Sequence, residues 1–316
     1  MKYIILILIF TISLFSSEFK KPSYTFKASG YVIDLVYKYD KIYASTNAGI
    51  VDIFNYKTKK LIKQIKVPDV LDFMGDSIPS KIFSVDDIDG QIMLLSKSKN
   101  GFNRVHIVKD GKKTLVIDYT QQLSAIKAKY INKDTILIAL LSNEIISYDI
   151  KNKKQNFNIQ VSGAKFSDFC LNEDKTEAAV TDESGVVTLL NTKTGKIIKI
   201  LKAENLDNVF QISYKNGVIA SAGQDRRVSI YVPKFESSYH IQTNFLIYSI
   251  GLSPKGKLAA YASDEENNIV VFNTVTKRNV AKFTGNIATI SDIEFIDENQ
   301  FLVSSNSPMI NLYKIK

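Results

Sequence analysis

One pattern recurs along most of this chain: a polar turn, a short apolar strand, a second polar turn and a second strand. The clearest copy is ESGVVTLLNTKTGKII, which runs from Glu183 to Ile198. A bulky side chain near the end of the first strand marks each copy. These markers are Phe54, Val108, Tyr148, Leu190, Tyr231, Phe272 and Tyr313. From Val108 onward they are 40, 42, 41, 41 and 41 residues apart, so the core has to be built from similar units that pack on one another.

A period near forty residues, with several short strands in each unit, is typical of β-propeller blades. Runs of alternating apolar and polar residues, or of β-branched residues, lie between turns rich in Gly, Asn, Asp, Ser or Lys and predict four strands in each of six units. In the sixth unit, we expect the first strand at Leu246–Leu252. The last unit offers only three strands before the chain ends, but an unpartnered strand, Ser23–Ala28, precedes the first unit. We therefore predict an all-β fold, a seven-bladed β-propeller with four-stranded antiparallel blades, whose last blade is closed by the N-terminal strand.

The N-terminal residues 1–17 differ from the repeats. Lys2 is followed by the apolar run YIILILIFTISLF and then by Ser16 and Ser17. This run is shorter than the roughly 20 residues that span a bilayer, which favours a cleaved secretory signal peptide. An uncleaved anchor is the alternative, because Leu14 and Phe15 form an imperfect cleavage site. We expect a signal peptide at 1–17, a single propeller domain at 18–316 and a periplasmic location.

Charge and cysteine content narrow the class of partner. The chain has a formal net charge of +9 and a pI near 9.2, which permits anionic partners. Expected export and the lack of an Arg-rich or aromatic-interleaved groove argue against nucleic acid. Cys170 is the only cysteine, so no internal disulfide can form, and its place in the strand-like SDFCL predicts a buried thiol.

Residues with catalytic or metal-binding potential are sparse. His106 and His240 fall in different units without a metal-ligand spacing, and we expect both in strands. Asp86, Asp87 and Asp89 in SVDDIDG lack the spacing of a calcium loop and are expected to form a turn. No nucleophile elbow, phosphate loop or haem motif is present in the sequence. We therefore predict that the protein is not an enzyme and has no catalytic, cofactor-binding or metal-binding residues.

Lysines concentrate in the turns between the third and fourth strands of the units. In a propeller these turns all emerge on one face, which we call the basic face. Its candidate residues are Lys57, Lys59, Lys60, Lys112, Lys113, Lys153 and Lys154. The opposite face is expected to collect acids such as Asp72, Asp182 and Asp264. The lysines either provide solubility and guard the outer strands, or they bind an anionic membrane surface or an acidic partner protein.

The repeat is interrupted once. The step from Phe54 to Val108 is longer than the others, and the extra residues lie in PDVLDFMGDSIPS, from Pro68 to Ser80. Insertions in repeat proteins often mark the binding face, and this one is expected beside the channel on the acidic face. Its candidate partner-binding residues are Val70, Leu71, Phe73, Met74 and Ile78. The alternative is a plug that folds over the central channel.

The units resemble WD40 repeats in period and strand order. The closest local match is SAGQDRRVSIYV from Ser221, in which Asp225 corresponds to the aspartate of the tight WD40 turn. The chain departs from the family because it has no Trp and no Gly-His pair at the start of its units. The resemblance implies the propeller architecture and no particular partner.

In overall character the chain resembles the NapL proteins, accessory factors encoded with the periplasmic nitrate reductase of epsilonproteobacteria. The shared features are a Lys-, Ile- and Asn-rich composition, a short signal and degenerate WD40-like units. This resemblance implies a non-catalytic role through contact with nitrate reductase components or maturation factors. Two alternatives remain: an envelope assembly scaffold similar to BamB, whose repeats share the TGK turn, and a propeller enzyme such as a quinoprotein or lactonase.

Overall fold

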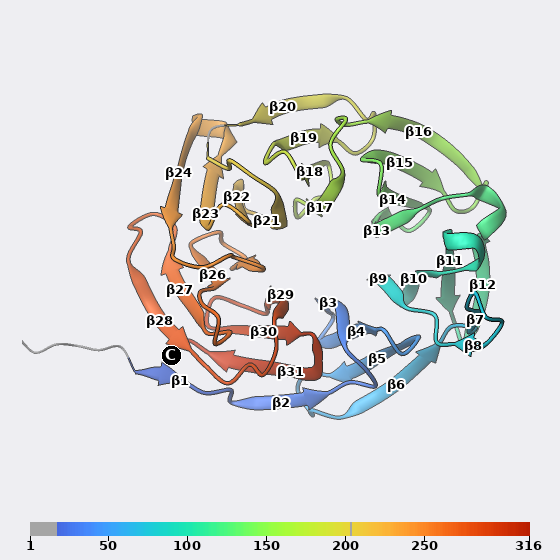
Figure 1. Cartoon of the computed structure of the whole chain (residues 1–316), viewed down its shortest axis with the longest axis horizontal. Helices are drawn as coiled ribbons and strands as arrows, with labels where there is room; N and C mark the ends of the chain where they lie inside the picture. The colour runs from blue at the N-terminus through green and yellow to red at the C-terminus, as the bar shows by residue number, and fades with distance from the viewer. Residues whose placement is uncertain (1–17, 203) are drawn as a thin grey trace, which may run out of the picture.

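Seven antiparallel sheets surround a central channel in the computed structural model, which describes residues 18–202 and 204–316 (Figure 1). Within each blade the first strand lines the channel and the fourth lies at the outer rim (Figure 1). This arrangement confirms the predicted seven-bladed propeller with four-stranded antiparallel blades. The predicted signal peptide, residues 1–17, lies outside the described residues.

The first three blades follow one another in chain order. Their strands are β3 (Val32–Lys38), β4 (Lys41–Thr46), β5 (Ile50–Asn55) and β6 (Leu61–Lys66); β9 (Ile82–Ile88), β10 (Gln91–Lys97), β11 (Asn103–Lys109) and β12 (Lys112–Ile117); and β13 (Ala125–Asn132), β14 (Thr135–Leu140), β15 (Glu144–Asp149) and β16 (Lys154–Gln160). Between the first two blades, β7 (Val70–Leu71) and β8 (Ser77–Ile78) form a separate small hairpin.

The next three blades keep the same order. Their strands are β17 (Phe166–Leu171), β18 (Glu177–Asp182), β19 (Val187–Asn191) and β20 (Ile197–Leu201); β21 (Val209–Lys215), β22 (Val218–Gly223), β23 (Arg227–Val232) and β24 (Ser237–Gln242); and β25 (Ile250–Leu252), β26 (Leu258–Ala262), β27 (Ile269–Asn273) and β28 (Asn279–Phe283). The helices of the described residues are three 3-10 turns, η1 (Lys99–Gly101), η2 (Tyr119–Gln121) and η3 (Pro233–Phe235). Within the described ranges, no helix is long and apolar enough to cross a membrane.

The N-terminal strand closes the seventh blade, as predicted. That blade contains β29 (Ile290–Phe295), β30 (Gln300–Ser305) and β31 (Ser307–Lys314), and β2 (Tyr24–Lys27) pairs antiparallel with β31. Phe26 of β2 is 2% exposed and packs on Phe54 of the first blade, so the closing strand also seals the seam of the ring. An additional strand, β1 (Phe19–Lys20), pairs parallel with β28 and was not predicted.

The hydrophobic core lies between neighbouring blades. Inner strands such as β4 and β14 are buried along almost their whole length, whereas the outer strand β6 is mostly exposed. One cluster joins Met93 and Val105 of the second blade to Tyr130 and Ile136 of the third. Because each buried apolar side chain of this size contributes about 1.5–3 kcal/mol, the blades are stabilised mainly by contact with one another.

One predicted strand is too long at its start. We expected the first strand of the sixth blade at Leu246–Leu252, but β25 covers only Ile250–Leu252. Ahead of it, the amide of Ile247 donates to the carbonyl of Gly223 in the fifth blade. The backbone before Ile250 is therefore held by the neighbouring blade, a contact that local strand periodicity cannot reveal.

Candidate functional site

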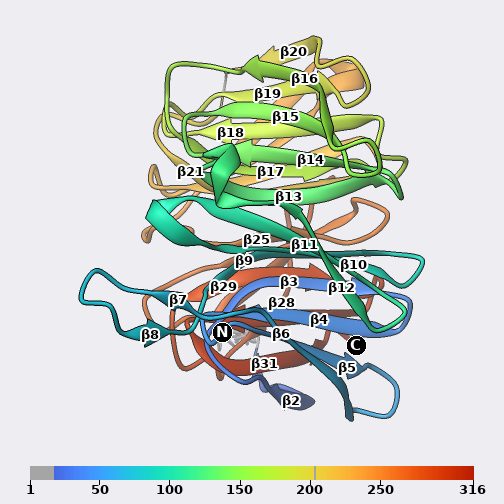
Figure 2. The same ribbon diagram turned by 90° about the vertical axis from the view of Figure 1, so that its right-hand side faces the viewer.

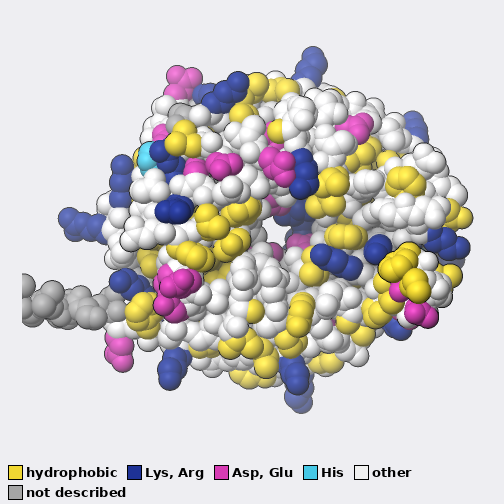
Figure 3. Space-filling model, viewed as in Figure 1, with side chains coloured by type: hydrophobic (Ala, Val, Ile, Leu, Met, Phe, Trp, Pro, Cys, Tyr) yellow, Lys and Arg dark blue, Asp and Glu magenta, His cyan; other side chains and the backbone are white. Residues whose placement is uncertain are grey.

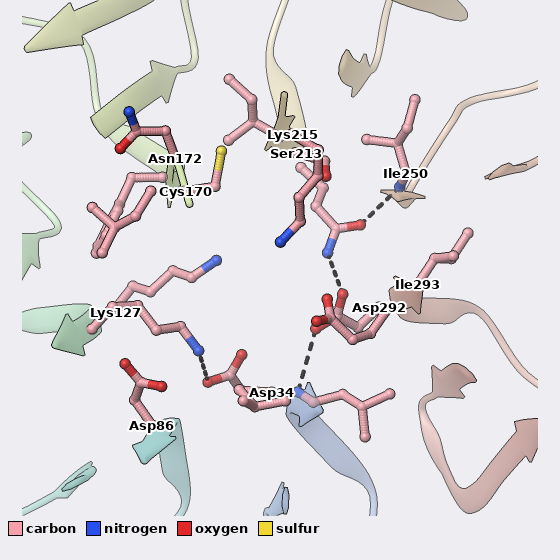
Figure 4. Close-up of a pocket in the computed structure, with 18 of the residues that line it drawn as sticks. Asp34, Asp86, Lys127, Cys170, Asn172, Ser213, Lys215, Ile250, Asp292 and Ile293 are labelled. Atoms are coloured by element: carbon pink, nitrogen blue, oxygen red, sulfur yellow. Dashed lines mark hydrogen bonds and ion pairs between the residues drawn. The ribbon is translucent and has the colours of Figure 1, made fainter. Parts of the chain in front are cut away.

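The first strands of the blades place charged side chains in the central channel. Figure 4 shows these side chains converging from several blades. They belong to a cavity of about 240 Å³, and its charged lining residues are Asp34, Lys38, Asp86, Lys127, Lys129, Glu173, Lys175, Lys215, Asp292 and Glu294. None of these residues was predicted as part of a site. A signal did exist: when the first strands are aligned by register, Asp34, Asp168 and Asp292 occupy the same position.

Side-chain oxygens on these strands connect most blades to the next one in the ring. At five of the seven contacts between neighbouring blades, a side-chain oxygen of one blade accepts a hydrogen bond from a backbone N–H in the first strand of the next blade. The bonds are Val85 N to Asp34 at 2.8 Å, Tyr130 N to Asp86 at 2.8 Å, Ile212 N to Asp168 at 3.0 Å, Ile250 N to Gln211 at 2.8 Å and Leu35 N to Asp292 at 3.3 Å. A buried amide without a partner would cost about 1–3 kcal/mol, so these groups are structural joints of the ring.

Two lysines of the third blade pair with carboxylates of the fourth and first blades. The Nζ of Lys127 lies 2.6 Å from Asp168, and the Nζ of Lys129 lies 2.8 Å from Asp34. Burial raises the pKa of Asp34, but the charges of Lys129 and Lys127 and its hydrogen bonds outweigh burial and hold the pKa below its ordinary value. Burial likewise opposes the charge of Lys127, and Asp168 and Asp34 outweigh it, so the pKa of Lys127 is raised.

Asp292 differs from these paired acids. It accepts hydrogen bonds from Leu35 N at 3.3 Å and from Gln211 Nε2 at 2.9 Å, as the dashed lines in Figure 4 show. Within residues 18–202 and 204–316 it has no ion pair within 4 Å. Burial, followed by the nearby carboxylates of Asp34 and Glu294, raises the pKa of Asp292 to about 7.

The channel mouth at the start of the first strands is lined by apolar side chains. Six of these strands have a register irregularity near their beginning. The residues there and just before β25 include the half-buried Ile33, Phe83, Ile126, Phe210 and Tyr248. The rings of the last two stack with centroids 5.3 Å apart. A cavity of about 350 Å³ at this mouth is therefore lined by these apolar side chains together with the charged Asp34, Lys127, Asp168 and Asp292.

The insertion forms the β7–β8 hairpin at the outer edge of the ring. It lies near β6 and β12 and projects from the disc (Figures 1 and 2). The residues that line the two channel cavities include none from 68–80. The alternative of a plug is therefore wrong, and so is the expected position beside the channel: β6 ends at the rim, and the hairpin continues outward from there.

The hairpin tip exposes apolar side chains on a fixed turn. Asp72 accepts hydrogen bonds from the amides of Met74 and Asp76, each at 2.9 Å. Of the predicted residues, Leu71, Phe73 and Met74 are 66%, 95% and 74% exposed, whereas Val70 is buried and Ile78 is half-buried. In Figure 3, hydrophobic and acidic side chains stand together where the hairpin lies in Figure 1.

The candidate lysines of the basic face do not all project freely. Lys60, Lys112, Lys153 and Lys154 are exposed. Lys57 pairs with Asp40 at 2.6 Å, Lys113 donates to Lys66 O at 2.7 Å, and Lys59 is half-buried with its Nζ 3.9 Å from the centroid of the Tyr56 ring.

The two faces are less different in charge than we expected. Tyr56 N donates to Asp40 O at 2.8 Å, which places the turns between first and second strands beside the lysine turns. Those turns bring acids to the same face: Asp40, Asp89, Asp134, Glu173, Asp174, Asp297 and Glu298. On the other face, Asp182 is 1% exposed and accepts hydrogen bonds from Ser162, Asn143 and Ser184.

The remaining chemistry-bearing residues have structural positions. His106 and His240 lie in β11 and β24, as predicted, and burial followed by the charge of Arg104 lowers the pKa of His106 to about 4. Cys170 lies in β17 and is half-buried, not fully buried as predicted, because it lines the channel cavity; desolvation raises the pKa of its thiol. The predicted turn is wrong for Asp86 and Asp87, which are buried in β9; the phenol of Tyr43 bonds Asp87.

These features define the chain as a seven-bladed β-propeller. A solved structure with the same fold is the β-propeller domain of Cps50 (Swd1) from Myceliophteria thermophila. The two superpose with a TM-score of 0.74 over 93% of this chain and 99% of that domain, at 12% sequence identity. No protein-family model and no curated protein matches the sequence. The likeness shows the fold alone, since propellers of this kind carry many unrelated functions.

Proposed function

We propose that this protein is a non-catalytic protein-interaction scaffold that binds a partner through the face bearing the β7–β8 hairpin. The observation that carries the proposal is the hairpin tip, where Phe73 is 95% exposed and Met74 is 74% exposed. Burying such a side chain against a partner contributes about 1.5–3 kcal/mol, and exposed aromatic anchors of this kind dominate binding energy. The Asp72 turn fixes the tip before binding, which lowers the entropy lost on association.

The channel mouth provides a second contact region on the same face. The hairpin lies in the connection between two blades, and the mouth residues begin the first strands, which follow such connections. Half-buried Phe210 and Tyr248 would gain further burial under a partner that also reaches the hairpin. A rigid ring that presents two apolar regions, one central and one peripheral, is suited to bind one partner over a wide area.

We infer further that the scaffold is periplasmic and supports nitrate reduction. The N-terminal pattern at 1–17, with its short apolar run and two serines, supports export by a cleaved signal peptide. The resemblance to NapL proteins supports contact with nitrate reductase components or their maturation factors. A BamB-like envelope assembly scaffold is the second candidate, because the repeats share the TGK turn at Thr194–Lys196.

Affinity capture from periplasmic extract tests this proposal. We expect wild-type protein to retain a nitrate reductase component and F73S/M74S to retain at least about tenfold less, because two anchors are removed. The matched control is F235S/V275S, which removes two side chains of similar exposure, 72% and 77%, from turns between third and fourth strands on the opposite face. The control should bind like wild type, and all three proteins should melt at the same temperature.

The outcomes separate the partner from the scaffold role. If no nitrate reductase component is captured and nitrate reduction is normal in a deletion strain, the nitrate reductase assignment is wrong. If another partner is captured and F73S/M74S loses it, the scaffold role stands. If F73S/M74S and F235S/V275S bind equally well, the hairpin is not the binding surface.

A further inference from the structure

Three ion pairs of the channel wall lie within the first four blades of the described residues. They are Lys38–Asp86, Lys127–Asp168 and Lys129–Asp34. Lys215 of β21 and Glu294 of β29 line the same cavity, and both are half-buried. Within residues 18–202 and 204–316, neither side chain has a hydrogen bond or an ion pair. Blades five and seven thus present two opposite charges without partners.

The blade between them adds no polar side chain to the wall. A Cβ on Gly251 would lie 2.3 Å from Ile293 O, so the first strands of the sixth and seventh blades are in direct backbone contact. The cavity lining near this contact is formed by Ile250 and Ile293. Lys215 and Glu294 therefore stand on either side of an apolar stretch, which leaves room for a ligand with separated charges and an apolar centre.

Two carboxyl groups of β29, Asp292 and Glu294, lie on one side of the cavity. Burial raises the pKa of Glu294, and the charges of Lys215, Lys129 and Lys38 offset this only in part. Asp292 lies on the same strand two residues earlier, and neither acid has an ion-pair partner in the described part of the chain. A cation between the two would be stabilised by both charges in a confined site of reduced dielectric. Figure 4 shows the Lys215 ammonium group extended into the cavity toward the side of Asp292.

We propose that the channel binds a small zwitterion, whose anionic group pairs with Lys215 and whose ammonium group pairs with Glu294 and Asp292. The cavity of about 240 Å³ would hold roughly eight water molecules, which suits a ligand the size of an amino acid. Asn172, Glu173 and Lys175, in the turn after β17, also line it and mark a route from the surface. This site is separate from the hairpin and does not depend on the scaffold role.

Calorimetry with a graded series of ω-amino acids tests the proposal. The probes are glycine, β-alanine, 4-aminobutyrate and 6-aminohexanoate, which differ mainly in the separation of their charges. The titrations are run near pH 8, where Asp292 is ionised. We expect saturable 1:1 binding with an optimum at one length. Butyrate and butylamine, which carry one charge each, should bind at least about tenfold more weakly than the best probe.

Two variants locate the binding. K215M and E294Q should each weaken the best probe at least about tenfold, whereas K193M, an exposed lysine outside the channel, should bind like wild type. The charge swap K215E/E294K keeps both charges and should recover binding that the single variants lose. Thermal unfolding followed by circular dichroism identifies any variant that fails to fold. In that case the proposal is tested on the wild-type protein alone, by the ω-amino acids of different length and the singly charged butyrate and butylamine.

Three results would overturn the proposal. The first is no heat and no thermal shift with any probe in the series. The second is butyrate binding as tightly as the amino acids, which would make the site a general anion site. The third is that the single variants bind the best probe normally, which would place it elsewhere on the molecule.

Discussion

The channel wall and the β7–β8 hairpin reverse the usual placement of polar and apolar side chains. In the channel, Asp168 is 6% exposed and both of its oxygens are bonded, one by Lys127 and one by Ile212 N. At the hairpin tip, Phe73 is 95% exposed. The buried charges hold blades together, whereas the apolar side chains of the tip are largely exposed. The comparison separates residues that maintain this fold from residues that are available for binding.

Removing Asp168 should have the largest effect on stability. D168A leaves Lys127 without its partner and the amide of Ile212 without an acceptor, which should lower the free energy of unfolding by about 3–5 kcal/mol. K193A, in an exposed turn of the same blade, should change it by less than about 0.5 kcal/mol. Urea unfolding measures both. A loss below about 1 kcal/mol in D168A would mean that water replaces the channel bonds.

Acidification should stabilise the seam between the seventh and first blades. The pKa of Asp292 is raised to about 7 in the folded protein and is near 4 in an unfolded chain, so the folded state binds more protons between these values. This group's contribution is complete below about pH 4 and is lost as the pH rises through about 7. The wild-type melting temperature should therefore fall between pH 5 and pH 8.

D292N provides the control for this pH dependence. An amide cannot ionise, so the variant should lose a part of the fall of a few degrees, while other groups keep their own contributions. Measurement at low and high salt separates the effect of burial on Asp292, which salt screens little, from the effect of the protein's overall charge, which salt screens strongly. Identical pH profiles for the two proteins would contradict the raised pKa.

The repeat predicted the ring, but it could not predict the inner wall of the channel. The steps of about 41 residues and the spare strand Ser23–Ala28 were sufficient for seven blades and their closure. Asp34 in VIDLVYK reads locally as the polar side of an ordinary strand. Whether that side faces bulk water or a confined channel depends on six other blades. The same limit explains why Asp86 and Asp87 were placed in a turn, since their partners Tyr130 and Tyr43 come from other blades.

Replacing the hairpin tip should have little effect on stability. F73S/M74S removes two exposed side chains and leaves Val70 and the Asp72 turn in place, so the free energy of unfolding should change by less than about 0.5 kcal/mol. Urea unfolding beside D168A makes the comparison direct. A loss comparable to that of D168A would show that the tip packs on the ring and is not a free binding surface.

The smallest expected effect concerns peripheral contact of the basic face with an anionic membrane. Lys60, Lys112 and Lys154 are exposed and, within the described residues, have no ion pair. Each lysine near such a surface contributes about 1 kcal/mol, but acids such as Asp40 and Asp134 on the same face reduce the attraction. Wild-type protein should sediment weakly with phosphatidylglycerol vesicles at low salt, and K60E/K112E/K154E should not. Equal sedimentation of the two would rule out this contact and leave the lysines the role of keeping the outer strands soluble.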